Sequence, residues 1–277
     1  MRGSIIGLMK ASRIPNLVIL SLAQILSILI ILKESILEIN TILVVISTAI
    51  IAAAGYIIND YYDQKIDMIN RPDKVVVGVS LKRRRALFLH SLFNFTAVAI
   101  GFFIDPLIGL IHIFSATILW LYSNQLRRLP LIGNLAIASL SGMSFLILSA
   151  HFRTTHQALL IYAFFAFLMV LIREIIKDIE DVKGEAAFGC VTVPVVWGIR
   201  GAKIIIYLVT AAGAGLLVSF LTTDMSWILR GYFFALTPFF IWFIFRVYKA
   251  DTKAHFAFLH QLCNYIILTG ILSILFN

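Results

Sequence analysis

The chain has 277 residues, of which 61% are hydrophobic and only 13% are charged. Soluble globular domains have about 45–50% apolar and about 25% charged residues, so this composition excludes an ordinary soluble enzyme, a disordered tail and a coiled coil. It is typical of a protein that crosses a membrane many times. The two cysteines, Cys190 and Cys263, are too few for a disulfide framework.

Apolar runs long enough to cross a bilayer, at about 20 residues each, follow one another along the chain. We predict nine of them, and therefore an all-α polytopic membrane protein whose residues 1–277 form one domain. The predicted spans are 15–32, 41–59, 86–104, 107–122, 131–150, 157–176, 203–221, 227–248 and 256–276. Charges and prolines separate them, as at Asp105-Pro106 and in the segment 127–130.

The net charge of +9 is distributed unevenly between the connections. Of the 23 Lys and Arg residues, all but Lys33, Arg153 and Arg230 lie at the N-terminus or near the even-numbered connections. Positive loops remain in the cytoplasm, so we predict a cytoplasmic N-terminus in the cell (inner) membrane, and nucleic acid is not needed to explain the charge. Two of these cytoplasmic connections, 60–85 and 177–202, are long and polar, and we expect them to carry the function.

The first long connection begins with a group of acidic residues. Asn59, Asp63 and Asp67 are spaced four apart, with Asp60 and Asp73 beside them. If the preceding helix continues, the three residues spaced four apart share one face.

A second acidic group follows the sixth predicted span, and the two groups together hold nine of the 14 acidic residues. Its members are Glu174, Asp178, Glu180, Asp181 and Glu185. Acids at a helix C-terminus oppose the helix dipole, so a cation should compensate them. Oxygen ligands without His or Cys favour Mg²⁺, which is commonly shared with substrate phosphates. The alternative is a pair of solvated helix ends with surface salt bridges, and the presence of two such groups argues against it.

Basic residues are interleaved with the acids. Arg71 and Lys74 follow the first group, Lys177 lies inside the second, and Arg127 and Arg128 lie between them. Guanidinium and ammonium groups bind phosphate oxygens. The sequence therefore predicts a site for a phosphate-bearing substrate and Mg²⁺.

These motifs together resemble the UbiA-type intramembrane prenyltransferases. Residues 59–67 read N-D-x-x-D-x-x-x-D and are followed by Asn70-Arg71-Pro72, while residues 177–185 read K-D-x-x-D-x-x-G-E, with Glu185 where an Asp is usual. Arg13-Ile14-Pro15-Asn16 resembles the R-x-P-N entry to the first helix of that family, and Tyr122, Arg127 and Asn134 resemble the stretch between its fourth and fifth helices. A departure is the run 75–78, which replaces the commoner R-P-L-x-x-G.

The resemblance implies a helical bundle around a central cavity and transfer of a polyprenyl group from its diphosphate to a lipid or aromatic acceptor. It implies two Mg²⁺ ions, with metal ligands Asn59, Asp63, Asp67, Asp181 and Glu185. The implied catalytic residues are Asp60, Asp63, Asp67, Lys177, Asp178 and Asp181. The implied substrate-binding residues are Arg13, Asn16, Arg71, Lys74, Tyr122, Arg127, Asn134 and Lys177.

The acceptor remains open at this point. The stretch 173–181 is most similar to the branch acting on geranylgeranylglyceryl phosphate, which makes ether lipids; hydroxybenzoates, naphthoates or homogentisate are the alternative, and porphyrins a more distant one. In other classes, a secondary transporter would place ionisable groups near the bilayer midplane, and a scaffold would keep the fold without catalysis. Phe145, Phe164, Phe165 and Phe167 are candidates for contact with an isoprenoid tail, and His112 is interpreted as a hydrogen-bonded neutral histidine.

Overall fold

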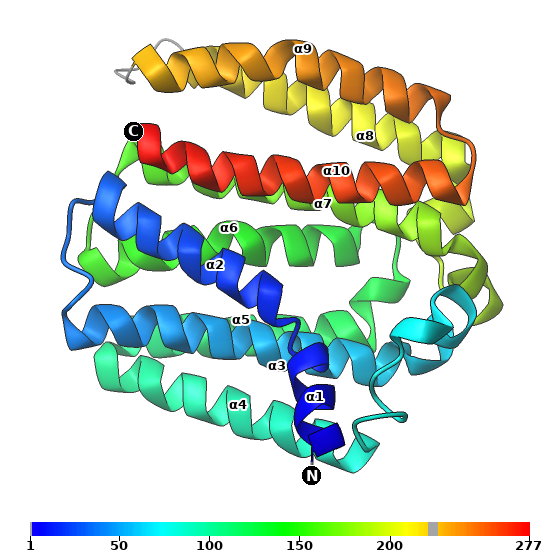
Figure 1. Ribbon diagram of the computed structural model, residues 1–277, viewed down its shortest axis with the longest axis horizontal. Coiled ribbons are helices and arrows are strands. Elements are labelled where there is room, and N and C mark those ends of the chain that lie inside the picture. The colour runs from blue at the N-terminus through cyan, green and yellow to red at the C-terminus, as the bar shows by residue number, and fades with distance from the viewer. Residues whose placement is uncertain (1, 221–226) are drawn as a thin grey trace.

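The computed structural model describes residues 2–220 and 227–277, and Figure 1 shows long helices running side by side in a bundle. The helices are α1 Arg2–Ala11, α2 Ile14–Leu26, α3 Ile39–Asn70, α4 Arg83–Ile104, α5 Pro106–Asn124, α6 Ile132–Phe152, α7 Gln157–Ala187, α8 Val193–Phe220, α9 Trp227–Lys249 and α10 Lys253–Leu272. A π-helical turn, Ser27–Ile31, continues α2, and a 3₁₀ turn, Ser273–Phe276, continues α10. The all-α prediction is confirmed.

Eight of the described helices are long and apolar enough to cross a membrane. They are α2 with its π-helical turn, α3, α4, α5, α6, α7, α8 and α10 with its 3₁₀ turn. The chain is therefore an integral membrane protein. α9 adds a further helix of 23 residues beside α8 (Figure 1). The count of nine spans and the orientation of the N-terminus stay predictions, and the expected end of the seventh span at residue 221 lies outside the described residues.

Two helices are longer than the sequence predicted. α3 continues beyond residue 59 to Asn70, and α7 continues beyond residue 176 to Ala187, so a large part of each expected polar connection is helical. With 32 and 31 residues, these helices are about 48 and 46 Å long at 1.5 Å per residue, well beyond the hydrocarbon thickness of about 30 Å. Neither extension contains a proline, and α3 ends directly before the Arg71-Pro72 step.

The two long helices are also the central ones. In their most apolar stretches 56% of α3 and 61% of α7 is buried inside the protein, against 17% for α4 and α8. The connections after α3, α5, α7 and α9 all lie at one end of the bundle (Figure 1). The polar extensions of α3 and α7 therefore meet at that end.

The side chain of Asn70 connects the two extensions. Asn70, the last residue of α3, donates through Nδ2 to the carbonyl oxygen of Asp181 at 2.9 Å and accepts from the Gly184 amide at 3.0 Å. The backbone carbonyl of Asn70 also accepts from Lys253 of α10 at 2.9 Å. This contact sets the position of the second acidic segment relative to the first.

Candidate active site

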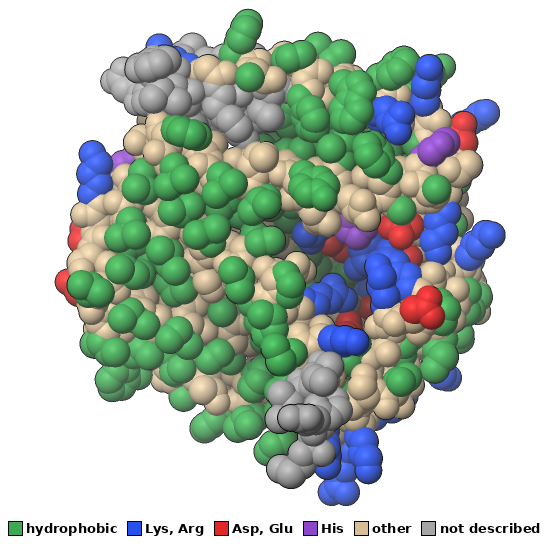
Figure 2. Space-filling view, viewed as in Figure 1, with side chains coloured by type: hydrophobic (Ala, Val, Ile, Leu, Met, Phe, Trp, Pro, Cys, Tyr) green, Lys and Arg blue, Asp and Glu red, His purple; other side chains and the backbone are tan. Residues whose placement is uncertain are grey.

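One cavity of about 710 Å³ lies between the two central helices and their neighbours. Its polar end is lined from the extension of α3, the segment after it, the start of α2, and α7. Its inner end is lined mainly by aliphatic side chains of four helices, α2, α3, α5 and α6: Leu20, Ile51, Ile111, Leu119, Leu140, Met143 and Ile147. Figure 2 shows a hollow with basic, acidic and histidine side chains between α10 and the α1–α2 region, with hydrophobic side chains next to it.

The first acidic segment lines this cavity. Asn59, Asp60, Asp63 and Asp67 all contribute to its wall, because α3 continues and places them on successive turns. Asn59 Nδ2 donates to Asp63 Oδ2 at 2.7 Å. The Arg13 guanidinium forms an ion pair with Asp60 at 3.0 Å. The N-terminal R-x-P-N residues thus reach the same wall as the acids.

In the second acidic group Glu174 lines the cavity, whereas Asp178, Glu180, Asp181 and Glu185 lie behind its wall. Asp178, Asp181 and Glu185 are buried, with at most 8% of each residue exposed. Asn134 of α6 donates to Asp178 Oδ2 at 2.7 Å, and the Thr192 hydroxyl donates to Glu185 Oε2 at 2.7 Å. These partners orient the carboxylates of Asp178 and Glu185, and the other oxygen of Glu185 faces Arg127.

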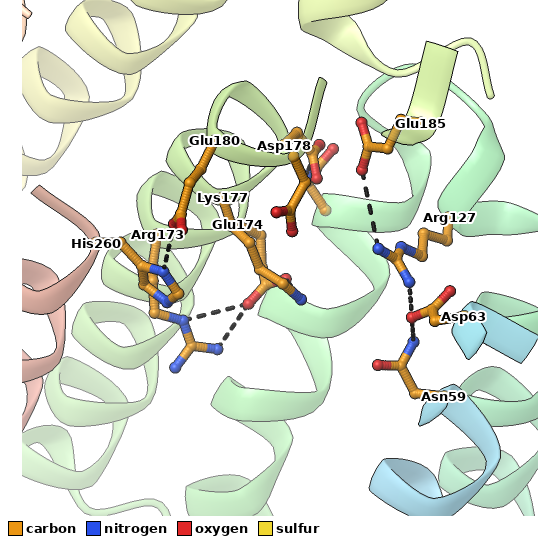
Figure 3. A network of polar contacts seen from close by, with 12 residues as sticks. Asn59, Asp63, Arg127, Arg173, Glu174, Lys177, Asp178, Glu180, Glu185 and His260 are labelled. Carbon is orange, nitrogen blue, oxygen red and sulfur yellow. Dashed lines mark hydrogen bonds and ion pairs between the residues drawn. The ribbon is translucent and has the colours of Figure 1, made fainter. Parts of the chain in front are cut away.

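Arginine side chains occupy the space between the two acidic segments. Arg127 forms ion pairs with Asp63 on one side and with Glu185 on the other, the second at 3.9 Å (Figure 3). Arg71 pairs through Nη2 with Glu180 at 3.0 Å and with Asp181 at 3.2 Å. The acidic faces therefore approach each other with guanidinium groups between them.

The donor set suits Mg²⁺ because every candidate ligand is an oxygen. Asp181 Oδ1 and Glu185 Oε1 are buried and accept no well-formed hydrogen bond within the described part of the chain, so they have capacity for a further cation. Among the described residues, no three acidic, histidine or cysteine side chains converge on one point. Metal binding by both segments together would thus require Arg71 and Arg127 to move away from the carboxylates.

Most of the remaining residues singled out in the sequence line this cavity. Asn16, Lys74, Tyr122 and Lys177 line it, together with Arg71 and Arg127. Asn134 does not line it and acts on the site through its bond to Asp178.

Among the other polar residues that line the cavity, four on α7 and α10 were given no role at the site from the sequence. Arg173 and Glu174 belong to α7, and His260 and Asn264 to α10. Arg173 donates to Glu174 Oε1 through Nε at 3.2 Å and through Nη2 at 2.8 Å. The signal that could have found them is the spacing of four in each helix, which puts Arg173 with Lys177 and His260 with Asn264 on shared faces.

The aromatic candidates have a different role from the one considered. Phe145 is buried in the core beside Tyr162, and Phe164 stacks on Phe167; neither these nor Phe165 lines the cavity. Aliphatic side chains form the inner wall in their place. His112 does line the cavity, and its Nε2 lies 2.8 Å from the Ser47 hydroxyl, which agrees with a hydrogen-bonded histidine.

The sequence profile of the UbiA prenyltransferase family matches residues 21–264. The chain belongs to the UbiA prenyltransferase family. It is therefore a membrane-embedded prenyltransferase.

Among UbiA relatives, a digeranylgeranylglyceryl phosphate synthase of Methanobrevibacter smithii is 35% identical over a match that covers 69% of each chain. A solved structure described as that of a digeranylgeranylglyceryl phosphate synthase superposes with a TM-score of 0.77 at 21% identity, over 100% of this chain and 99% of the other. A UbiA homologue from Archaeoglobus fulgidus, solved with GPP and Mg²⁺, superposes with a TM-score of 0.70 at 14% identity, over 97% and 99%. Both structures share the fold of this chain.

Proposed function

We propose that this protein transfers a geranylgeranyl group from geranylgeranyl diphosphate to geranylgeranylglyceryl phosphate within the membrane, with Mg²⁺ as cofactor and the whole chain as one catalytic unit. The observation that carries the proposal is the continuous cavity. Its polar end has carboxylate and basic side chains, and its inner end is mainly aliphatic. A diphosphate attached to a long isoprenoid chain has the same division into a charged and an apolar part.

The donor diphosphate is assigned to the polar end. Asn59, Asp63 and Asp67 would hold one Mg²⁺ on α3, and Asp181 and Glu185 would hold a second one on α7. When bound, these ions neutralise the charge that develops on the leaving diphosphate. Asp60 and Asp178 support the two ligand sets from the neighbouring positions.

Basic side chains supply the rest of the donor site. Arg71, Lys74 and Arg127 line the cavity beside the carboxylates and would bind diphosphate oxygens. Arg71 and Arg127 are paired with the acids. Each guanidinium is therefore close enough to the donor site to exchange its carboxylate partner for a diphosphate oxygen.

The reaction itself needs little covalent chemistry from the protein. The bond between the first prenyl carbon and the diphosphate oxygen breaks, the acceptor hydroxyl oxygen bonds to that carbon, and the hydroxyl proton passes to a carboxylate of the α3 wall. The aliphatic inner wall keeps water away from the allylic cation, which water would otherwise capture. Tyr122, Asn16 and Asn134 position groups around this centre.

The experiment is a transfer assay with the purified protein in lipid nanodiscs. Mg²⁺, geranylgeranyl diphosphate and one acceptor at a time are supplied: geranylgeranylglyceryl phosphate, 4-hydroxybenzoate, a dihydroxynaphthoate or homogentisate. We expect a prenylated product, detected by mass spectrometry, with the glycerophosphate acceptor alone and its loss in excess chelator. Full turnover in excess chelator would contradict the proposed role of Mg²⁺. A preference for an aromatic acceptor would contradict the proposed identity of the acceptor.

We also propose that the end of the bundle holding the site faces the cytoplasm of the cell (inner) membrane, in agreement with the distribution of Lys and Arg. A cysteine introduced at Ser80, in the segment after α3, should then react with a membrane-impermeant maleimide only in inverted vesicles. Labelling in intact spheroplasts would show that this end of the bundle faces the opposite side of the membrane.

A further inference from the structure

The cavity wall formed by α7 and α10 carries polar groups that the donor site leaves unused. Arg173 and Lys177 share one face of α7, and His260 and Asn264 share one face of α10. In Figure 3, Arg173 and His260 lie on one side of the gap, while Asn59, Asp63 and Arg127 lie on the other.

The basic side chains of this wall carry more positive charge, and more hydrogen-bond donors, than the carboxylates of the wall pair with. Arg173 and Lys177 share the single carboxylate of Glu174, with Lys177 Nζ 3.6 Å from Oε2. Arg173 donates two of its five N–H groups to Glu174. The His260 ring uses Nδ1 in a contact of 3.2 Å with Glu180, which leaves Nε2.

The arrangement suits an anion that is bound without a metal. The carboxylates proposed to bind Mg²⁺ at the donor diphosphate lie elsewhere. They are on the far side of the gap or behind Arg71 and Arg127. On this side Glu174 is buried between two basic groups, with 7% of its side chain exposed. A phosphate monoester has three terminal oxygens and up to two negative charges, so it can accept from donors on two helices at once.

The mouth of the cavity indicates what carries that anion. The hollow in Figure 2 opens on the side of the bundle between α10 and the α1–α2 region, beside a surface of hydrophobic side chains. α10, which borders this opening, contributes His260 and Asn264 to the cavity wall. A molecule that enters here from the bilayer would have an apolar tail and would place its headgroup against these residues.

We propose that Arg173, His260 and Asn264 bind the phosphate monoester of a lipid acceptor, and that Lys177 lies between this phosphate and the donor diphosphate. The inference rests on the proposed function and adds the site at which the acceptor is recognised. It explains why the protein has two basic surfaces in one cavity. It also places the acceptor hydroxyl, which is next to the phosphate in a glycerol phosphate, on the donor side.

The test is a binding measurement without donor and without turnover. The full chain in nanodiscs is titrated with a C20-isoprenoid glycerol ether phosphate, with the same ether lacking the phosphate, and with inorganic phosphate. We expect the phosphate to tighten binding of the ether at least tenfold, because charge-assisted hydrogen bonds are the strong ones. Arg173→Ala should remove this preference, Arg173→Lys should keep part of it, and Asn264→Ala should weaken it a few-fold.

Controls separate this site from the donor site and from general charge effects. Arg153→Ala removes an arginine whose side chain is 83% exposed and pairs with Asp105, and it should change nothing. Mg²⁺-dependent binding of geranylgeranyl diphosphate should stay within about twofold in Arg173→Ala and Asn264→Ala. Asn264 is exposed, so its replacement is not expected to disturb folding.

Three results would overturn the proposal: no preference for the phosphorylated ether, a preference that survives in both Arg173→Ala and Asn264→Ala, or inorganic phosphate binding as tightly as the lipid phosphate. If the protein still binds and transfers the prenyl donor in those cases, only the acceptor site is wrong. If the wild-type chain transfers to no acceptor at all, the proposed function is wrong.

Discussion

The bond between Asn70 and α7 offers a direct test of how the two acidic segments are aligned. Asn70→Ala removes the donation to the Asp181 carbonyl and the acceptance from the Gly184 amide, but it keeps the backbone contact with Lys253. Asn70 is 8% exposed, so water does not readily replace the lost partners. At about 1 kcal/mol for each net hydrogen bond, the substitution should cost about 2 kcal/mol of stability.

The predicted loss is large enough to measure. With about 2–4 °C for each kcal/mol, the apparent melting temperature in detergent should fall by about 4–8 °C. The effect on activity should be greater than the effect on stability, because misplacement of a catalytic group by 1 Å can cost about 100-fold in rate. We therefore expect prenyl transfer, assayed well below the melting temperature, to fall at least tenfold.

Asn94→Ala is the matched control, since Asn94 contacts only His90 within its own helix α4 among the interactions described. It should leave the transfer rate unchanged. If Asn70→Ala lowers the melting temperature but keeps the full transfer rate, Asn70 stabilises the fold without aligning the site. If neither the melting temperature nor the transfer rate changes, the hydrogen-bonded contact of Asn70 with α7 is wrong.

Three other predictions concern the same region. Asp63→Asn keeps the shape of the side chain but removes its charge, so turnover in the transfer assay should fall at least about 100-fold. Asp105→Asn, at the opposite end of the bundle, should have almost no effect on turnover. Equal losses in the two variants would contradict the proposed position of the active site. Arg127→Ala leaves the two acidic segments without the cation between them, so the rise in melting temperature on adding Mg²⁺ should be larger than in the wild type, and a smaller rise would contradict its role. Gly184→Ala places a Cβ 2.5 Å from Asn70 Nδ2, so it should lower the melting temperature, and its effect should be less than additive with Asn70→Ala.

Much of the architecture could be predicted because the signals are local. A run of about 20 apolar residues predicts a membrane span wherever it occurs, and the structure has helices at each predicted span within its described residues. The spacing of four in Asn59, Asp63 and Asp67 indicated a shared face on a continued helix, and α3 does continue to Asn70. The lengths of α3 and α7 were underestimated because polarity was interpreted as the end of a helix, whereas these helices extend beyond the hydrocarbon region.

The sequence by itself therefore determined the class of protein, the two acidic motifs and the family that they resemble. Only the tertiary structure decided how these parts face one another. The rotation of α7 puts Lys177 on the cavity wall and Asp181 behind it, and Arg127 lies between Asp63 and Glu185. Asn70 meets residues more than 100 positions away, and α10 brings His260 to the same cavity as Arg173. Such contacts depend on the packing of whole helices against each other, and a spacing pattern within one helix carries no information about the neighbour that it will face.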